Sequence, residues 1–254
     1  MKKLHNFIAS ENELLNKHLD LNEIDESISE LKTEKIFRMT KNVTNLAAEF
    51  KEVEKLIILI DIVGFSKDTT RNQVYKIYLF QRYLMAQLLG NKLSFSGKIR
   101  INHFVPTGDG CYIVAEKCPQ ELALSLLLQI ISGFKNLQTE NGISLSLRAS
   151  ALIGKVVPFV DMAHHINFIG EGMNEASRIL SGGQKELESH YLNEHPGALY
   201  GDEKKYSRNS LFLGDSLASS IENYKEYCLN IFNYKDVPDK HGMKRNITVL
   251  QGIL

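Results

Sequence analysis

The most regular apolar pattern in the chain is an unbroken run of aliphatic residues over positions 56–60, which leads directly into Asp61. A short continuous apolar run is typical of a β-strand that is buried on both faces. A carboxylate at the end of such a strand is costly to bury unless it is paired or binds a cation. Gly64 follows in a turn, and successive backbone N–H groups around a flexible glycine are suited to binding phosphate. The alternative interpretation is a strand end at which Asp61 caps the next helix.

The spacing of apolar residues predicts the elements that follow. Helical spacing predicts a helix that begins near Thr69 or Thr70 and ends at Gly90, and a second helix, apolar nearly all round, over 122–137. The glycine–aspartate–glycine turn at 108–110 predicts a hairpin with Asp109 at its tip. Further helices are expected over 168–182, closed by two glycines, and over 214–224. Strands are predicted at 98–104, 111–115, 143–153, 155–160, 211–213, 227–234 and 247–250, with a break at Gly154 and a basic turn over 235–245.

The same pattern divides the chain into two parts. Residues 1–50 are charged and rich in helix formers, which predicts a helical N-terminal extension, and residues 51–254 form the main domain. Within that domain, residues 183–209 are polar and predict an irregular insertion. Strands and helices alternate but hairpins also occur, so a mixed sheet is favoured over a purely parallel one.

Composition narrows the possible functions. The 254 residues are 43% hydrophobic, which is enough for a substantial core, and 30 basic residues balance 30 acidic ones. A neutral chain has no general attraction for nucleic acid or for a membrane surface, and no apolar run reaches membrane-spanning length. We also recognise no signal peptide. The three cysteines, Cys111, Cys118 and Cys228, cannot all pair and lack the spacing of metal ligands, so a reduced, cytoplasmic protein is expected.

Two aspartates stand out as candidate metal ligands. Asp61 and Asp109 are each expected to end a buried strand, and they lie 48 positions apart. Only a fold that places those strands side by side can unite them. If they meet, two carboxylates form a hard-oxygen pair suited to Mg²⁺ or Mn²⁺. Two carboxylates can also serve as the acid and base of a glycosidase, but that interpretation leaves the phosphate-type turn unexplained.

Four segments, in this order, resemble the catalytic domain of class III nucleotide cyclases, the adenylyl and guanylyl cyclase family. The first two, LIILIDIVGFS (56–66) and PTGDG (106–110), are similar to that family's metal-site motifs. The third, SLRASALIGKVV (146–157), resembles its arginine-bearing strand, and FIGEGMNEASRI (168–179) resembles its helix with asparagine and arginine. The resemblance implies an α+β fold of the ferredoxin-like kind, with a mixed, mainly antiparallel sheet flanked by helices. Residues 1–50 lie outside it, and 210–254 fit the family's closing strands loosely.

The resemblance implies a role for each matching residue. Asp61 and Asp109, with the Ile62 carbonyl, would bind two divalent metal ions, Mg²⁺ or Mn²⁺. The triphosphate would be held by Arg148 and by the backbone amides of Val63, Gly64, Phe65 and Ser66. Lys240 or Lys244, in the basic turn, would supply a further triphosphate contact, although a solvated charged turn is the more common meaning of such a run.

Asn174 and Arg178 are the residues that the resemblance assigns to catalysis. Asn174 would orient the ribose, and Arg178 would stabilise charge on the α-phosphate as the ribose 3′-oxygen attacks. The two are four residues apart, and therefore lie on one face of a helix. A planar, permanently charged guanidinium suits a phosphoryl transition state. In this family the pair serves the metals of the other subunit, which implies a head-to-tail homodimer with two composite sites.

The two positions that select the purine in this family carry neither purine pattern here. Adenylyl cyclases have lysine with aspartate or threonine at these positions, and guanylyl cyclases have glutamate and cysteine, whereas this chain has Val105 and Asn167. The Asn167 amide can both donate and accept, so it could read uracil, or cytosine after a flip, and the same flip admits adenine or guanine. The chain in this respect resembles the pyrimidine cyclases of bacterial antiphage Pycsar systems. We expect UTP to be converted to cUMP first, and CTP to cCMP second.

Three other functions stay open from the sequence. One is an adenylate cyclase with an atypical base pocket. Another is a degenerate cyclase domain that binds a nucleotide without chemistry and acts as a regulatory module. The third is a palm-type enzyme such as a diguanylate cyclase, although the turn at 107–111 lacks that group's Gly-Gly-Asp-Glu-Phe pattern.

Overall fold

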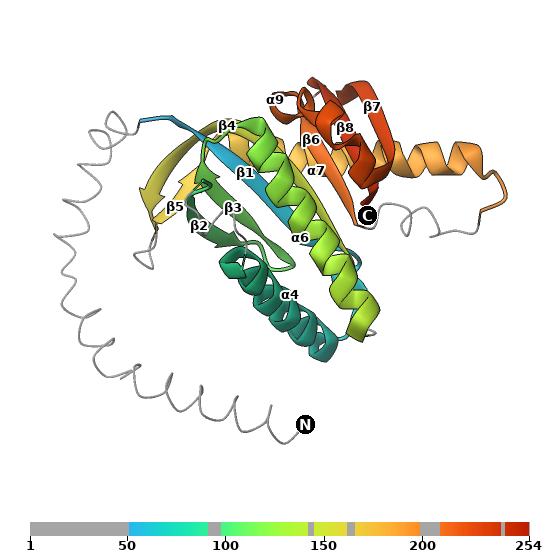
Figure 1. Ribbon diagram of the computed structural model, residues 1–254, viewed down its shortest axis with the longest axis horizontal. Helices are drawn as coiled ribbons and strands as arrows, with labels where there is room; N and C mark the ends of the chain where they lie inside the picture. The colour runs from blue at the N-terminus through green and yellow to red at the C-terminus, as the bar shows by residue number, and fades with distance from the viewer. Residues whose placement is uncertain are drawn as a thin grey trace. The chain divides into compact units, whose positions relative to one another are not determined.

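The computed structural model describes residues 51–90, 98–141, 145–161, 166–198, 209–239 and 242–253 (Figure 1). The predicted helical extension over 1–50 lies outside the described residues. The strands of the described part are β1 (Val53–Ile62), β2 (Ile101–Pro106), β3 (Gly110–Glu116), β4 (Leu147–Val160), β5 (Ile166–Ile169), β6 (Ser210–Gly214), β7 (Cys228–Pro238) and β8 (Lys244–Ile253). The helices are α4 (Thr70–Gly90), α6 (Gln120–Asn141), α7 (Glu171–Glu194) and the short α9 (Asp215–Ala218), with 3₁₀ turns η1 (Phe65–Lys67) and η2 (Ile221–Tyr227).

The strands form one mixed sheet. Its order is β2-β3-β1-β4-β6-β8-β7, and β5 pairs with β4 away from this path. The pairing of β4 with β6 is parallel, and the other pairings in the described residues are antiparallel. Helices cover both faces, with α4 and α6 on one side and α7 on the other (Figure 1). The predicted mixed, mainly antiparallel sheet flanked by helices is therefore confirmed.

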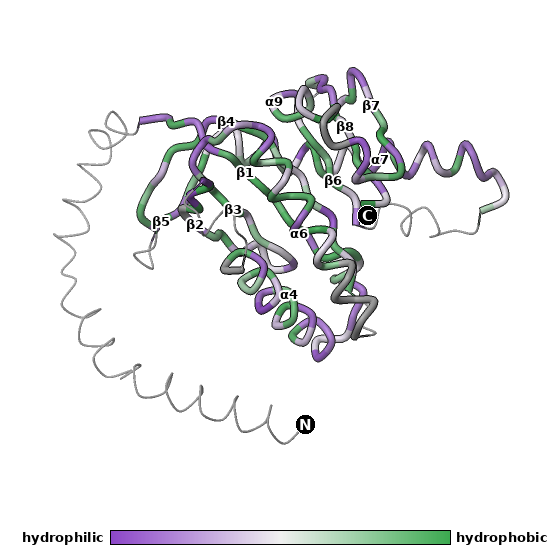
Figure 2. The backbone as a smooth tube through the Cα atoms, viewed as in Figure 1, coloured by the Kyte–Doolittle hydropathy of each residue, from purple (hydrophilic) through white to green (hydrophobic). Residues whose placement is uncertain are grey.

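Strand β1 lies inside the sheet, between β3 and β4, and contributes to two hydrophobic cores. Because successive side chains point to opposite faces, Ile58 and Ile60 pack with α4 and α6, whereas Ile57 and Leu59 pack with α7. These β1 side chains are buried, and β1 is green, the colour of hydrophobic residues, along much of its length in Figure 2. The unbroken apolar run predicted a strand covered on both faces, and that prediction is confirmed.

Two glycines that the sequence suggests as breaks lie inside regular elements instead. Strand β4 continues through Gly154, where an added Cβ would lie 2.9 Å from the Cα of Gly172 in α7. Helix α7 continues through Gly183, where an added Cβ would lie 2.4 Å from Cδ1 of Phe212. Both glycines let the helix approach the sheet closely. The predicted break at Gly154 and the predicted helix end at 182–183 are therefore wrong.

The predicted irregular insertion over 183–209 is wrong for its first half. Residues 183–194 belong to α7, and Leu187 on that segment is fully buried. The polar residues of the segment lie on the exposed side of an amphipathic helix, which explains why they resemble a loop in sequence. Residues 199–208 of the predicted insertion lie outside the described residues.

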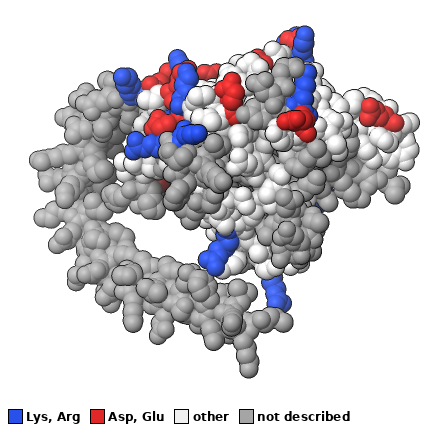
Figure 3. All heavy atoms as spheres, viewed as in Figure 1, with Lys and Arg blue, Asp and Glu red and all other residues white. Residues whose placement is uncertain are grey.

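The C-terminal elements agree with the prediction in kind and differ in length. The predicted helix over 214–224 is split between α9 and η2, and the closing strands β7 and β8 are longer than predicted. Much of the predicted basic turn over 235–245 is therefore strand, and Arg245 lies in β8. None of the described helices is long and apolar enough to cross a membrane. Acidic and basic side chains are interspersed on the face shown in Figure 3, as expected for a chain without net charge.

Candidate active site

The sheet brings Asp61 and Asp109 together. Strands β1 and β3 pair in antiparallel register, so that Asp61 lies opposite Gly110. The Ile62 N–H donates a 2.9 Å hydrogen bond to the Asp109 carbonyl, which fixes the hairpin tip beside the end of β1. The Asp109 carboxyl is close enough to act on the ionisation of Asp61. The convergence of the two carboxylates, inferred from two distant motifs, is present in the structure.

Asp61 is a buried carboxylate whose neighbours have opposing effects on its ionisation. Its side chain is 11% exposed, and Arg148 in β4 donates to its Oδ2 from Nε at 2.7 Å and from Nη2 at 2.6 Å. Burial raises the pKa of Asp61 to about 6, Arg148 opposes that rise, and Asp109 adds to it. Nη1 of Arg148 also donates to the Gln184 side chain of α7. The side chain predicted to contact a triphosphate is therefore held against the candidate metal ligand.

The turn after β1 has the geometry of an anion-binding loop, with one exception. Gly64 has φ +74°, a left-handed conformation that favours glycine, and the 3₁₀ turn η1 begins at the next residue. The Gln73 side chain donates to the Phe65 carbonyl at 3.2 Å and ties the turn to α4. The Val63 N–H, however, donates to the Ser146 carbonyl at 2.9 Å. Val63 is therefore unsuited to hold phosphate, and the prediction stays with Gly64, Phe65 and Ser66.

The oxygen donors at the end of β1 fit a divalent cation of the magnesium type. In the described residues no group of three or more histidine, cysteine or acidic side chains is placed to hold a metal. Two carboxylates and a backbone carbonyl are instead the hard donors that Mg²⁺ and Mn²⁺ accept together with substrate oxygens and water. The raised pKa of Asp61 supports the fit, because a cation at this point would favour its ionised form.

Asn174 and Arg178 lie on the same face of α7, as their spacing predicts. They line a pocket of about 700 Å³ between α7 and the turn that joins β7 to β8. Tyr112 in β3 donates to the Met173 carbonyl at 3.2 Å, and Ser150 in β4 donates to the Ala176 carbonyl at 2.7 Å. These two bonds anchor the first turns of α7 to the sheet on either side of Asn174. The remaining lining residues are Ser177, Ser181, Gly182, Lys185, Val237, Pro238, Asp239, Arg245 and Ile247.

The lining of this pocket includes neither of the two aspartates. Helix α7 runs along the sheet toward the end that carries Asp61, and there its Gln184 accepts a hydrogen bond from Arg148. In the described part of the chain, no hydrogen bond or ion pair links Asn174 or Arg178 to either aspartate. One protomer therefore carries both halves of the predicted site without joining them.

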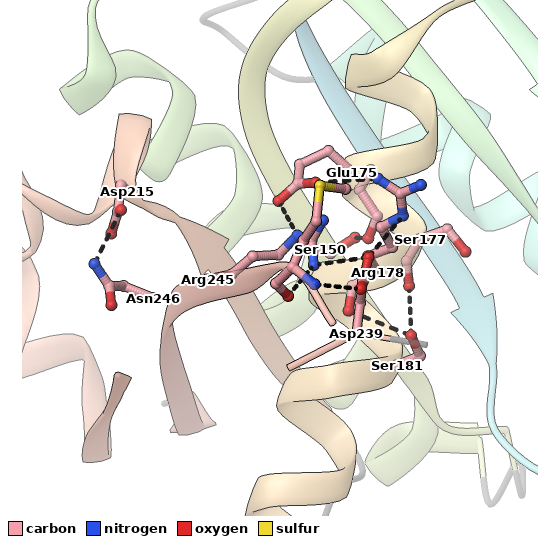
Figure 4. Close-up of polar contacts among 11 residues, drawn as sticks. Ser150, Glu175, Ser177, Arg178, Ser181, Asp215, Asp239, Arg245 and Asn246 are labelled. Atoms are coloured by element: carbon pink, nitrogen blue, oxygen red, sulfur yellow. Dashed lines mark hydrogen bonds and ion pairs between the residues drawn. The ribbon is translucent and has the colours of Figure 1, made fainter. Parts of the chain in front are cut away.

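The sequence interpretation missed the charged residues that surround Arg178. Glu175, Asp239 and Arg245 form ion pairs in this pocket (Figure 4). Glu175 precedes Arg178 by three residues, a spacing that places both on one helix face and could have indicated the pair. Arg245 lies in the basic segment from which Lys240 and Lys244 were chosen. Lys244 is exposed at the start of β8, whereas the adjacent Arg245 lines the pocket. Lys240 lies outside the described residues.

The two predicted base-reading residues lie on neighbouring strands. Val105 is in β2 and Asn167 is in β5, and these strands contact each other. The His103 and Phe168 rings, each close in sequence to one of them, lie 5.2 Å apart between centroids. Oδ1 of Asn167 accepts a 2.8 Å hydrogen bond from the Phe168 N–H. Its amide NH₂ is thus the group left to meet a base, which favours an acceptor atom such as a carbonyl oxygen.

Comparison with known proteins gives a likeness in structure only. No protein-family model and no curated protein sequence matches the chain. The catalytic core of a rhodopsin-guanylyl cyclase with converted specificity, in complex with ATPαS, is similar at a TM-score of 0.52 and 18% identity, over 80% of this chain and 98% of that one. The guanylate cyclase domain of RhGC from Catenaria anguillulae, in complex with GTP, is similar at a TM-score of 0.52 and 18% identity, over 80% of this chain and all of that one.

A third structure agrees. An adenylate/guanylate cyclase/hydrolase from Silicibacter pomeroyi gives a TM-score of 0.51 and 15% identity, over 80% of this chain and 98% of the other. At such low identities the likeness establishes the fold alone. The mixed sheet with helices on both faces is the fold of these nucleotide cyclase domains.

Proposed function

We propose that this protein is a nucleotide cyclase, a phosphorus–oxygen lyase that converts a nucleoside triphosphate into its 3′,5′-cyclic monophosphate and pyrophosphate. The observation that carries the proposal is the meeting of Asp61 and Asp109 beside the Gly64 turn, at the end of the interior strand β1 of a cyclase-type sheet. Asn174 and Arg178, on one face of α7, support it. The arrangement offers oxygen donors, phosphate donors and a guanidinium, which are the components that phosphoryl transfer requires.

The residues at the end of β1 would hold two divalent ions and the triphosphate. Asp61, Asp109 and the Ile62 carbonyl would bind Mg²⁺ or Mn²⁺, which when bound activates the ribose 3′-hydroxyl and neutralises the leaving pyrophosphate. The amides of Gly64, Phe65 and Ser66 would hold the terminal phosphates. Arg148 would share its contacts between Asp61 and the triphosphate, since its guanidinium carries donors beyond the two that Asp61 receives.

Asn174 and Arg178 would complete the site of a second copy of the chain. Arg178 would stabilise negative charge on the α-phosphate in the transition state, and Asn174 would orient the ribose. Because the pocket that these residues line does not include the aspartates of their own protomer, a head-to-tail homodimer would unite the two halves. A two-fold axis would form two such composite sites from one sequence.

For the substrate we propose a pyrimidine triphosphate, UTP before CTP, and a role as the signal generator of an antiphage system of the Pycsar kind. Val105 gives the base no hydrogen bond, and Asn167 presents its NH₂ because its oxygen is held by the Phe168 N–H. Uracil O4 and cytosine N3 are acceptors that such a donor can read. Adenine and guanine also carry acceptors, so the measurement must include all four nucleotides.

The test is turnover of each nucleotide separately. We expect the protein with Mn²⁺ to form cUMP from UTP, with less cCMP from CTP, measured by mass spectrometry of the products. Asp61→Asn should abolish product formation, while Asp215→Asn, an exposed aspartate that accepts a hydrogen bond from Asn246, should leave it unchanged. Cyclic purine products without pyrimidine products would overturn the base assignment and leave an adenylate or guanylate cyclase.

A second candidate function is a nucleotide-binding regulatory module that performs no chemistry. The close pairing of Arg148 with Asp61 favours it, because that ion pair occupies an oxygen that a catalytic metal would use. Calorimetric binding of UTP with no cyclic product from any nucleotide, in Mg²⁺ and in Mn²⁺, would identify this function.

A further inference from the structure

Four charged side chains in the α7 pocket form a closed ring, which we call the arginine–carboxylate ring: Glu175, Arg178, Asp239 and Arg245. Glu175 pairs with Arg178 through Oε2 and with Arg245 through Oε1. Asp239 pairs with both arginines through Oδ2. Figure 4 shows these side chains pointing toward one another from α7 and from the β7–β8 segment. Two positive and two negative charges therefore balance around the residue proposed to act in catalysis.

Arg245 is the most firmly held arginine of the ring. Its side chain is 9% exposed, and its Nε donates to Glu175. Its Nη1 lies 3.1 Å from Asp239 Oδ2 in an ion pair and donates to the Met243 carbonyl at 3.1 Å. Burial would lower the pKa of Arg245, but the Glu175 and Asp239 carboxylates outweigh it and keep the pKa above its ordinary value. A planar guanidinium can bridge two carboxylates in fixed directions, which a lysine cannot do. Arg245 thus ties α7 to the β7–β8 turn.

Asp239 is rigid as well. Its side chain is 6% exposed, and Oδ1 accepts a 2.9 Å hydrogen bond from the Met243 N–H. Its backbone closes the same turn, since its N–H donates to the Met243 carbonyl at 2.9 Å. The position of Oδ2, which faces both arginines, is therefore set by the turn and not by Arg178.

Arg178 is held more loosely than Arg245. Its Nε lies 3.4 Å from Asp239 Oδ2 and its Nη1 lies 3.8 Å from Glu175 Oε2, and the side chain is 22% exposed. At these distances the carboxylates attract the guanidinium without the short, aligned hydrogen bonds of a strong pair. Arg178 is directed by the two carboxylates and retains the capacity to bind an anion in the pocket.

We propose that Arg245 is a positioning residue: through Glu175 and Asp239 it sets the orientation of the Arg178 guanidinium in the pocket. The catalytic consequence rests on the proposed cyclase function, but the positioning itself does not. Without Arg245, the two carboxylates would lose their shared partner and draw Arg178 into tight pairs of its own. Misplacing a catalytic group by about 1 Å can lower a rate about 100-fold.

The experiment follows Arg178 directly by NMR. The Nε–Hε resonance of Arg178 in the full ¹⁵N-labelled chain is identified by its loss in Arg178→Lys. We expect Arg245→Met to shift this resonance, because it removes both pairs and keeps an apolar stem, and Arg245→Lys to shift it less. Arg71→Met, which removes an exposed arginine in α4, is the matched control and should leave the resonance in place.

The NMR result decides the positioning whether or not the chain is a cyclase. An unchanged Arg178 resonance in a folded Arg245→Met protein would overturn the proposal. Should that variant fail to fold, Arg245→Lys and Glu175→Gln take its place, and an unchanged resonance in both has the same meaning. If the wild-type chain makes no cyclic product while the resonance moves, the proposed function fails and the positioning stands.

Where turnover is measurable, kinetics add a second criterion. We expect Arg245→Met to lower kcat about 10- to 100-fold with KM within about twofold, and Arg245→Lys to restore part of the loss. A raised KM with an unchanged kcat would overturn the proposal, since it would make Arg245 a direct substrate contact.

Discussion

The two halves of the candidate site are built in different ways. Asp61 and Asp109 meet because two adjacent strands pair in one register, and the hydrophobic pattern of β1 enforces that register. Arg178 is placed by a tertiary junction between α7 and the β7–β8 segment, which supplies Asp239 and Arg245. The first half pairs the buried Asp61 with the half-buried Asp109, and the second is a neutral ring of four charged side chains beside a pocket. The difference indicates that the first half is built to bind cations, and that the second holds a guanidinium ready for an anion.

The largest effect is expected from an experiment that tests whether the two halves of one active site come from different protomers. Asp61→Asn and Arg178→Ala should each lower cyclase activity about 100- to 1,000-fold, because each removes a charge that we propose faces the reacting phosphates. An equimolar mixture that exchanges subunits should recover about one quarter of wild-type activity, since half of the dimers are mixed and each has one intact site. Product formation before and after subunit exchange is the measurement.

The control pairs two variants of the same half. A mixture of Asp61→Asn with Asp109→Asn damages both sites of every mixed dimer and should recover nothing. Equal recovery in both mixtures, or no recovery in either, would show that the halves are not shared between protomers.

The electrostatic difference between the halves predicts a pH dependence of stability in the metal-free protein. Burial raises the pKa of Asp61 to about 6, against 3.8 for the ordinary group. Between these values the folded chain binds more protons than the unfolded chain, so this group makes the free energy of unfolding fall as pH rises. The loss reaches about 3 kcal/mol above pH 6, and it should be recovered on protonation below about pH 4.

Urea denaturation across this pH range tests the prediction. The contributions of the other titratable groups to the free energy of unfolding cancel when variants are compared with the wild type. Asp61→Asn should remove this part of the slope, and Asp215→Asn should keep it. Mn²⁺ should raise the melting temperature of the wild-type chain more at pH 7.5 than at pH 5, since protons compete for the same carboxylate. A wild-type slope identical to that of Asp61→Asn would contradict the assignment.

The same contrast explains what could be predicted from the sequence. The strand ending in Asp61, the hairpin tip at Asp109 and the helix face of Asn174 and Arg178 follow from local patterns with fixed periods. The meeting of Asp61 and Asp109 at the end of β1 required only that two strands be neighbours. Arg245 and Asp239 could not be found in this way, because nothing in the β7–β8 segment indicates which of its charges turns toward α7.

The length of α7 was missed for a related reason. Glycine usually weakens a helix, and the pair at 182–183 resembles a stop signal in sequence. The structure shows that Gly183 is needed because Phe212 of β6 packs against the helix at that point. Helix propensity is a local quantity, whereas this contact joins segments 29 positions apart, so the sequence alone could not reveal that tertiary packing overrides the local signal.

The smallest effects are expected at the two adjacent glycines of α7, which test how that helix packs on the sheet. Gly183→Ala places a methyl 2.4 Å from Phe212 and should destabilise the protein by about 1–3 kcal/mol through overpacking. Gly182→Ala meets Val237 at 3.2 Å and Ile247 at 3.4 Å, so the helix propensity gained, about 1 kcal/mol, should offset the tighter contact. Urea denaturation of both variants is the measurement. Equal stability of the two would mean that α7 does not pack on β6 at Gly183, and that the pocket around Arg178 is framed differently.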